Sequence, residues 1–563
     1  GVAEPVICET FHELPVTLSA QCLSSLEGYE GDGRPMVVLN TNLAYKGTVA
    51  PKYSANPAQR TSIVPSKIHG YLPPTTRPAP LKSDDVGGAF SPLITGCDNH
   101  GHPPKLFDES LLARAKEALR NQYLTACKPV RHEVGVLDET TAVLGIPGLG
   151  GFQAMEFGTS EGYPFTAFRP QGESNKRYLF NISEDRTSVT FDERLRAQLD
   201  ARLSMRRSGI IPMTVFTDCL KDSRILTSKY YTPGKTRIFS ISPTDFTIQF
   251  RQYFLDIMAA QKICRMDLEH AVGINVHSFE WTVLARRILR VGDSVLCGDY
   301  SNFGPGLSSQ VVHAVGEVWC DWYEYHESKQ GLPKEELAER RRIRQIMFEE
   351  MRHSHHLVGN VVYQALCGSP SGAPATVNIN NDVNKLYIYM AWLNCFKDDP
   401  MMASIVAFRK HCSLFVYGDD LVCGVSDHVK DVFNNVYLQQ FFADHGIRYT
   451  DERKSGEITS YVPFAQAGFL KGVWNRHPTR PGVLTYGLAK SSIEDIANWH
   501  MTAVDTEEAT RQACCDSLMQ AYGWGPDYFN QHRERLISAW AELDGVSPLV
   551  LYTYEEMDSM RHG

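Results

Sequence analysis

The 563-residue sequence predicts an α+β fold in which antiparallel hairpins are combined with separate amphipathic helices. Two apolar runs, Leu414–Tyr417 and Leu421–Cys423, flank Gly418-Asp419-Asp420, a pattern typical of a β-hairpin. Apolar residues recur with helical spacing in residues 108–124 and 333–351. The composition, with 43% hydrophobic and 21% charged residues, is that of a globular protein with a large core.

The composition excludes several classes of protein. No apolar stretch of the sequence reaches the length of a membrane span, and no signal peptide opens it. The net charge of −9 gives no general affinity for nucleic acid, so such a site would need a local basic groove. Fourteen cysteines lack the spacing of zinc sites, so we expect reduced, mostly buried thiols of a cytosolic protein. The first residue, Gly1, suggests release from a precursor by a protease or merely the chosen boundary of the sequence.

The first part of the chain is expected to form strands and long loops. Residues 1–105 are rich in Pro, Gly and Thr, and the run Leu72–Pro80 must be extended. A helix follows over residues 108–124. The glycine-rich segment Gly145–Gly151 lacks the Lys-Ser/Thr pair of a phosphate-binding loop, so a plain loop is predicted.

A basic stretch surrounds a Pro-Gly turn between residues 221 and 237. Its cations are Lys221, Arg224, Lys229, Lys235 and Arg237. On a hairpin these side chains could line a channel for phosphates, or they could form an ordinary solvated surface.

Three carboxylates stand at the ends of short apolar strands. Asp299 follows Val295–Cys297, and Asp419 and Asp420 occupy the tip of the predicted hairpin. Buried neighbouring carboxylates repel each other and need cations, and oxygen ligands suit Mg²⁺ or Mn²⁺. A solvated turn is the alternative for each of them. Contact between Asp299 and the hairpin tip would favour the metal site.

The helix predicted for residues 333–351 begins after Pro333. We expect its arginine run, Arg340–Arg344, to be a solvated face. Three histidines near its end, His353, His355 and His356, are expected on the surface rather than at a metal. The last part of the chain, from about residue 476, is predicted to be helical.

A Ser-Gly loop leads into a further predicted helix. This helix carries Thr376 and Asn380 on one face, where polar groups can bind the edge of a sugar. A serine nucleophile is disfavoured because the Gly-x-Ser-x-Gly elbow is absent from the sequence.

The order of these motifs resembles that of the RNA-dependent RNA polymerases of picorna-like viruses, over about residues 130–545. The motifs are Thr159-Ser-x-Gly-Tyr-Pro, the basic stretch, Asp299-Tyr-Ser-Asn-Phe, Ser371-Gly-x-x-x-Thr-x-x-x-Asn, Tyr417-Gly-Asp-Asp, Lys454-Ser and Phe469-Leu-Lys. The segment Gly298–Leu307 looks most like the insect iflaviruses, and the first hundred residues match loosely, through Arg60–Ser66.

The resemblance implies a closed right-hand fold of fingers, palm and thumb, with an antiparallel palm sheet backed by helices. The ranges it implies are fingers with an N-terminal extension over 1–250, palm over 251–305, fingers over 306–366, palm over 367–475 and thumb over 476–563.

The resemblance also implies a role for each motif. Asp299 and Asp419, assisted by Asp420, would hold two Mg²⁺ ions, for which Mn²⁺ can substitute, and Lys454 would donate a proton to pyrophosphate. The residues implied to bind the nucleotide are Lys221, Lys229, Lys235 and Arg237 along its entry path, and Ser371, Thr376 and Asn380 near its ribose. The residues implied to contact RNA are Thr159, Ser160 and Tyr163 on the template, and Phe469 and Lys471 on the primer.

The partners implied are an RNA template and primer, nucleoside triphosphates and a viral protein primer, although initiation without a primer stays open. The expected location is the host cytoplasm, at membrane-associated replication complexes. One departure from the family is Gly304, where relatives carry a second Asp that orients the Asn sensing the 2′-hydroxyl.

Two rival functions stay open. A reverse transcriptase also has a carboxylate hairpin, but the Ser371–Asn380 motif and the small Gly304 argue against it. A catalytically inactive RNA-binding scaffold is disfavoured because Asp299, Asp419 and Asp420 are all present.

Overall fold

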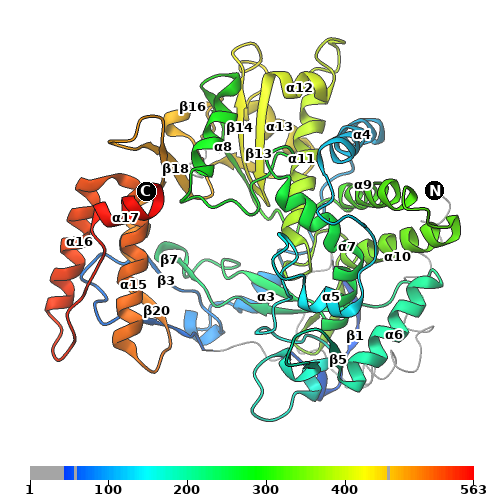
Figure 1. The fold of residues 1–563 in the computed structure, drawn as a ribbon, viewed down its shortest axis with the longest axis horizontal. Coiled ribbons are helices and arrows are strands. Elements are labelled where there is room, and N and C mark those ends of the chain that lie inside the picture. The colour runs from blue at the N-terminus through cyan, green and yellow to red at the C-terminus, as the bar shows by residue number, and fades with distance from the viewer. Residues whose placement is uncertain (1–42, 56–59, 453–456) are drawn as a thin grey trace.

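The fold, taken from a computed structural model, is described for residues 43–55, 60–452 and 457–563 (Figure 1). Gly1 and Lys454 lie outside these residues. Several small sheets and the helices packed on them position the candidate site. Among the described residues no helix combines the length and the hydropathy that a membrane span requires.

A four-stranded antiparallel sheet holds the predicted hairpin. Its strand order is β13 (Cys412–Tyr417), β14 (Asp420–Val425), β9 (Ser294–Leu296) and β16 (Val462–Pro463). The hairpin β13–β14 pairs Tyr417 with Asp420, so Gly418 and Asp419 form its two-residue turn. Such a turn favours left-handed backbone, and Gly418 adopts it with φ 59°.

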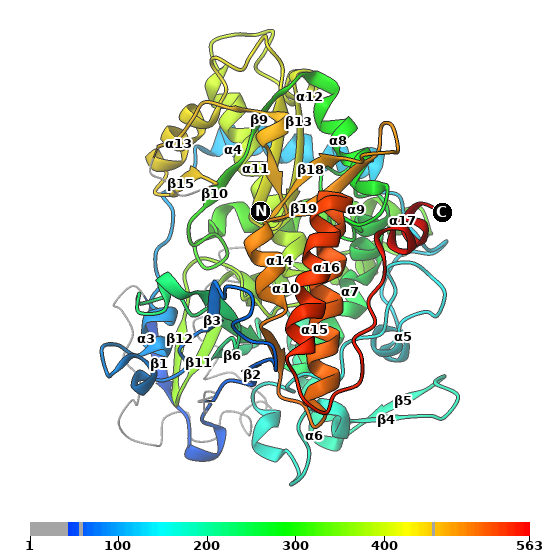
Figure 2. The same ribbon diagram turned by 90° about the vertical axis from the view of Figure 1, so that its left-hand side faces the viewer.

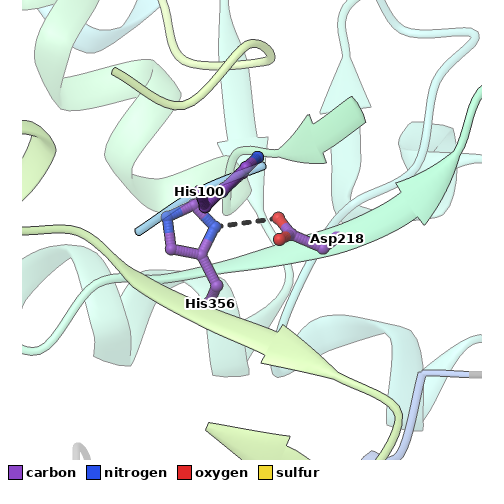
Figure 3. A group of neighbouring side chains, drawn as sticks. All are labelled: His100, Asp218 and His356. Carbon is purple, nitrogen blue, oxygen red and sulfur yellow. Dashed lines mark hydrogen bonds and ion pairs between the residues drawn. The ribbon is translucent and has the colours of Figure 1, made fainter. Parts of the chain in front are cut away.

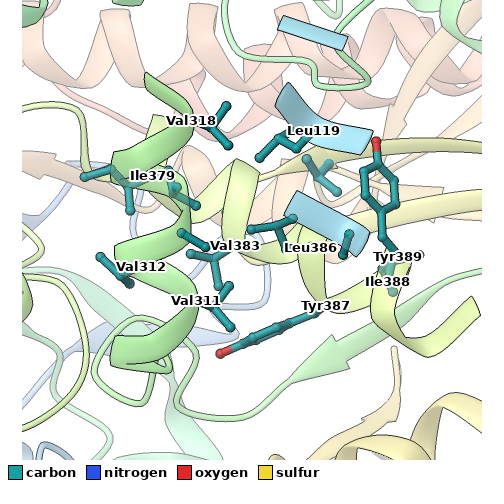
Figure 4. Close-up of a cluster of buried hydrophobic side chains, with 14 of the residues drawn as sticks. Leu119, Val311, Val312, Val318, Ile379, Val383, Leu386, Tyr387, Ile388 and Tyr389 are labelled. Carbon is teal, nitrogen blue, oxygen red and sulfur yellow. The ribbon is translucent and has the colours of Figure 1, made fainter. Parts of the chain in front are cut away.

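Three helices pack against one another beside this sheet. They are α4 (Glu109–Ala126), α9 (Ser309–Ser328) and α11 (Thr376–Cys395). Figure 4 shows Leu119, Val312 and Val383, one from each helix, meeting in the largest apolar cluster. The start of α4 follows from the sequence, because the side chain of Asp108 accepts a hydrogen bond from the Leu111 amide. The neighbouring strands are β10 (Gly298–Tyr300) and β15 (Tyr449–Asp451), and the neighbouring helices are α12 (Ile405–His411) and α13 (Asn435–Asp444).

A five-stranded sheet carries the basic stretch. Its strand order is β1 (Ala44–Thr48), β12 (Val361–Gln364), β11 (His355–Val358), β6 (Val215–Leu220) and β8 (Ile238–Ile241). Strands β11 and β6 are parallel, and the other pairs are antiparallel. The elements around it are α3 (Pro92–Cys97), α5 (Glu139–Leu144), α6 (Glu193–Arg207), α7 (Thr244–Ile263), α10 (Lys334–Arg352), β4 (Phe180–Ile182) and β5 (Val189–Phe191).

The C-terminal helices form a unit with its own core, in orange and red at the left of Figure 1. They are α14 (Lys490–Ile496), α15 (Thr506–Ala521), α16 (Pro526–Ala541) and α17 (Tyr554–His562). Figure 2 shows α15 and α16 side by side. A three-stranded sheet leads into them, formed by β17 (Gly468–Phe469), β18 (Gly472–Arg476) and β19 (Leu484–Leu488), and α8 (Glu280–Ile288) packs on it.

Two short ladders connect the first hundred residues to later parts of the chain. Strand β2 (Ile63–Pro65) pairs with β20 (Trp499–Met501) beside the C-terminal helices. Strand β3 (Thr76–Pro78) pairs with β7 (Arg224–Leu226) within the basic stretch. The described residues of the N-terminal part therefore lie over two distant regions.

The structure confirms the helices predicted for residues 108–124 and 333–351, but three other predictions are wrong. His355 and His356 are not on the surface: they are 2% and 5% exposed, because β11 lies between two other strands. The arginine run is not simply a solvated face: Arg342 is exposed, but Arg344 is 1% exposed and forms an ion pair with Glu327 of α9. The segment after residue 476 continues as a strand, β19, before it becomes helical.

Candidate active site

The structure brings the three candidate aspartates together. Asp299 is the central residue of β10, which packs beside β14. Asp419 lies in the turn before β14, and Asp420 is the first residue of that strand. Burial raises the pKa of Asp420 to about 7, and repulsion from Asp419, Asp299 and Glu452 contributes to the rise. The meeting of carboxylates that the sequence alone left undecided is therefore present, and Glu452 is a fourth acidic group there.

Two asparagines of α11 fix the turn that carries these aspartates. The amide of Gly418 donates to Oδ1 of Asn381 at 2.6 Å, and Nδ2 of Asn384 lies 3.0 Å from the Gly418 carbonyl and 3.2 Å from that of Asp420. The hydroxyl of Tyr300 donates to Oδ1 of Asn384, which connects β10 to the same network. Sequence reasoning missed both asparagines, although a run of asparagines in an apolar helix is a signal of buried polar contacts.

A second turn holds Asp420 from the opposite side. The amide of Leu470 donates to Oδ2 of Asp420 at 2.8 Å. Leu470 and Lys471 both have left-handed backbone, with φ 54° and 63°, in the turn between β17 and β18. The side chain of Lys471 is exposed, whereas Phe469 is 1% exposed and packs in an apolar cluster. Of the two residues expected on the primer, only Lys471 therefore offers its side chain to a surface.

The basic stretch is a hairpin whose cations face different surroundings. The amide of Lys221 donates to the Arg237 carbonyl at 2.8 Å, which extends the β6–β8 pairing. Lys221, Lys235 and Arg237 are exposed, and Lys229 is half-buried. Arg224 instead pairs with Asp495 of α14 at 2.9 Å, so it serves the packing of the C-terminal helices.

The Ser-Gly loop is tied to this hairpin. Oγ of Ser371 accepts a hydrogen bond from the Ser240 amide on β8 at 3.0 Å, and the hydroxyl of Thr376 lies 2.8 Å from the Pro370 carbonyl. Both hydroxyls thus hold the loop in place. Oδ1 of Asn380 is different, because it is buried and has no hydrogen-bond partner among the described residues.

The position of Gly304 is open. A Cβ placed on Gly304 would meet no atom within 4 Å. The Gly304 carbonyl accepts a hydrogen bond from the amide of Ser369, whose own hydroxyl is buried and unpartnered in the described part of the chain. The site therefore contains space and spare polar atoms near the residue where relatives are expected to carry a carboxylate.

The residues expected on the template are only partly at the surface. Thr159 is exposed, and Oγ of Ser160 donates to the buried Glu161. Tyr163 is 5% exposed and packs edge-to-face against Tyr53, so its ring lies inside the fold. Ser160 and Tyr163 both line a cavity of about 270 Å³.

Comparison with known proteins shows which family the chain belongs to. A family model described as viral RNA-dependent RNA polymerase matches residues 113–539. The chain is 37% identical over 568 residues to the genome polyprotein of Deformed wing virus, an iflavirus, covering 99% of the chain and 19% of the polyprotein. It is 30% identical over 496 residues to the replicase polyprotein of Drosophila C virus, covering 85% of the chain and 28% of that protein. The chain thus spans less than a third of the length of either relative.

A solved structure shares the fold. The RNA-dependent RNA polymerase 3Dpol of a sicinivirus superposes with a TM-score of 0.73 at 19% identity, covering 92% of this chain and 98% of that one. This likeness confirms the predicted fold, a right hand of fingers, palm and thumb.

Proposed function

Because the chain belongs to the viral RNA-dependent RNA polymerase family, we propose that it copies an RNA template from nucleoside triphosphates by two-metal nucleotidyl transfer. The observation that carries the mechanism is the meeting of Asp299, Asp419 and Asp420. Their mutual repulsion, which contributes to the raised pKa of Asp420, is relieved by bound cations.

The side chains gathered there suit the cation that we propose. Carboxylate oxygens are the ligands that Mg²⁺ and Mn²⁺ prefer, and Asp299 and Asp419 would hold them with Asp420 assisting. The bound ions would supply charge neutralisation for the triphosphate and activation of the primer hydroxyl. The Asn381–Asn384 network and the Leu470 amide keep the carboxylates in position before any ion arrives.

The remaining residues fit roles in substrate binding. Exposed Lys221, Lys235 and Arg237 would attract the triphosphate, with half-buried Lys229 at the margin. Asn380 would bind the ribose directly, whereas Ser371 and Thr376 would act by holding their loop. Thr159 and Ser160 would contact the template and Lys471 the primer, with Tyr163 and Phe469 supporting them from the interior. Lys454 keeps its proposed role as proton donor.

The proposed division of the chain follows the ranges expected from the sequence. The four-stranded sheet falls in the palm (251–305 and 367–475), the five-stranded sheet mainly in the fingers (1–250 and 306–366), and α14–α17 in the thumb (476–563). We further propose that the protein replicates a positive-strand RNA genome in the host cytoplasm at membrane-associated complexes, with a viral protein as primer.

Primer extension tests the function. With oligo(U) on poly(A) in Mg²⁺, the protein should incorporate UTP and discriminate against dTTP. Asp299→Asn and Asp419→Asn should each abolish extension while the melting temperature stays near that of the wild type. Asp444→Asn, which changes an exposed carboxylate of α13, is the control and should remain active. Preference for dTTP would indicate a reverse transcriptase, and RNA binding without any extension would indicate a scaffold.

A further inference from the structure

A second cluster of ionisable side chains lies in the five-stranded sheet, outside the carboxylate site. His100 follows α3, Asp218 is on β6 and His356 is on β11 (Figure 3). One ligand atom from each lies within 4.8 Å of the other two. Nδ1 of His356 is 2.8 Å from Oδ1 of Asp218, and the rings of His100 and His356 meet edge-to-face with centroids 5.4 Å apart. Three distant segments of the chain thus aim nitrogen and oxygen atoms at one point.

A cysteine lies beside the group. The Cys97 thiol is buried and not in a disulfide, and its Sγ is 3.9 Å from Oδ2 of Asp218. A cavity of about 10 Å³ lies among these four side chains, and the rest of its lining includes the apolar Leu43 and Val358. That volume is close to the space of one water molecule or one ion.

Burial and neighbouring charges shift the pKa values of these side chains in different directions. Burial raises the pKa of Asp218, but the attraction of His356 and hydrogen bonds outweigh it and hold that pKa below its usual value. Burial lowers the pKa of His100 to about 4. Burial, and next to it Asp218, raise the pKa of the Cys97 thiol well above its usual value.

We propose that Cys97, His100, Asp218 and His356 form a closed structural site for one Zn²⁺ ion. Two imidazoles, a carboxylate and a thiolate are a ligand set that zinc accepts, whereas Mg²⁺ prefers oxygen ligands only. Tetrahedral zinc ligands lie roughly 3.4 Å apart. The 3.9 Å between Sγ of Cys97 and Oδ2 of Asp218 therefore has to shorten, and the 2.8 Å between Nδ1 of His356 and Oδ1 of Asp218 has to lengthen. Binding converts the Cys97 thiol to a thiolate, and its proton passes to solvent.

The surrounding hydroxyls can orient the ligands. Nε2 of His356 lies 2.7 Å from Oγ of Ser354, so a ring bound to the ion through Nδ1 can donate its remaining proton there. Oγ of Ser240 donates to Oδ1 of Asp218 at 2.6 Å, which leaves Oδ2 on the side of Cys97. Both serines thus fix the direction in which the ligands point.

The site would fasten α3 to β6 and β11, and β6 leads into the hairpin that carries Lys221, Lys235 and Arg237. A second group, formed by His477, Asp558 and His562, provides a contrast. Its carboxylate already accepts from Arg480 at 2.9 Å and from Tyr522 at 2.6 Å. A fixed cation therefore occupies the place that an ion would take, and this group serves as the control.

Metal analysis tests the proposal without any activity measurement. The full chain is loaded with Zn²⁺, dialysed against excess Mg²⁺ to fill the carboxylate site, and its zinc content is measured by mass spectrometry. We expect about one zinc per chain in the wild type, far less in His100→Gln and Cys97→Ser, and wild-type content in His562→Gln. Chelation should lower the melting temperature of the wild type but not that of His100→Gln.

The absorption spectrum of the Co²⁺-loaded protein tests whether Cys97 is one of the ligands. The Co²⁺-loaded wild type should show a thiolate-to-cobalt charge-transfer band that Cys97→Ser loses and His562→Gln retains. Equal zinc in the wild type and His100→Gln, or none in either while both melt cooperatively, would overturn the site and leave only a hydrogen-bonded cluster. A cobalt spectrum without the thiolate band would overturn the assignment of Cys97.

Discussion

At the scale of single residues, the surroundings of Asp420 oppose its ionisation. Its pKa is raised to about 7, mainly by burial and further by neighbouring carboxylates. In metal-free protein the folded state therefore keeps a proton that the unfolded state has lost, between about pH 4 and pH 7. The free energy of unfolding then falls as pH rises through this window, and the penalty is fully present above it.

The ionisation of Asp420 makes the free energy of unfolding depend on pH. Asp420→Asn removes the charge but keeps an oxygen for the Leu470 amide, so we expect it to stabilise the metal-free protein. The gain should be greater at pH 8 than at pH 6 by about 1 kcal/mol, because the wild-type penalty is still growing between these values. Urea unfolding in a chelator measures it, with Asp444→Asn as control. An equal gain at both values would contradict the raised pKa.

Recognition of the sugar gives the second prediction. A site that hydrogen-bonds a hydroxyl rejects the analogue without it, because its own polar groups are then left unpaired. Oδ1 of Asn380 is buried without a partner in the described part of the chain, whereas Nδ2 of Asn302 already donates to the Asn99 carbonyl at 2.7 Å. Asn380→Ala should therefore lower the preference for UTP over dTTP, by roughly 10-fold or more, and Asn302→Ala should change it less.

The measurement is the ratio of incorporation efficiencies for UTP and dTTP. Gly304→Asp belongs in the same series. Its fold should persist, since a Cβ there meets no atom within 4 Å, but the new carboxylate lacks prepared partners and should reduce activity. An unchanged ratio in Asn380→Ala would show that another group binds the sugar.

At the scale of elements, the cations of the β6–β8 hairpin have two different roles. Arg224 forms an ion pair with Asp495, whereas Lys235 and Arg237 are proposed to bind the triphosphate. Lys235→Ala and Arg237→Ala should each lower kcat/KM for UTP by roughly 10-fold or more, since bonds from cations to phosphate are strong. Their stability should change by less than about 0.5 kcal/mol, because both side chains are exposed. Lys334→Ala, at an exposed position of α10, is the matched control. Wild-type kinetics in both hairpin variants would make the hairpin an ordinary solvated surface.

Elements also show where sequence reasoning succeeds and where it stops. The hairpin β13–β14 and the helices α4 and α10 could be predicted because their signals, alternation and helical spacing, lie within the segment itself. The burial of His356 could not, since one of the two strands beside β11 is β6, about 140 residues away in the chain, as the contact of His356 with Asp218 illustrates. Secondary structure follows largely from the sequence of the segment itself, whereas burial depends on which segments pack together.

The same limit applies to the candidate site. Motif order pointed to Asp299 and Asp419, whose chemistry needs those residue types. It did not indicate that Asn381 and Asn384 hold the turn, because they act through backbone contacts with Gly418. Nor did it separate Phe469 and Tyr163, which are buried, from residues that present side chains at the surface.

At the scale of the whole molecule, one carboxylate joins three regions. Asp495 of α14 accepts hydrogen bonds from Thr75 in the N-terminal part and from Arg224 in the basic hairpin, and its side chain is 2% exposed. Removing its charge leaves the Arg224 guanidinium without its ion-pair partner in a half-buried place.

Asp495→Asn should therefore destabilise the protein by roughly 2–4 kcal/mol. Thermal or urea unfolding measures the loss. Asp516→Asn on α15 is the control, because this exposed carboxylate accepts a hydrogen bond from Gln512 of the same helix. A loss no larger than that of the control would mean that Asp495 does not join these regions energetically.

The pairing of β2 with β20 also limits when the first of these strands can fold during synthesis. Oγ of Ser66 donates to the carbonyl of Ala497, a residue 431 positions later in the chain. At roughly 5–20 residues per second, a ribosome delivers the second partner roughly 20–90 s after the first. Throughout that interval the backbone of residues 63–65 has no ladder to join, so this early segment is among the last to reach its final place. The contact can close only after the segment that holds Ala497 has been synthesised.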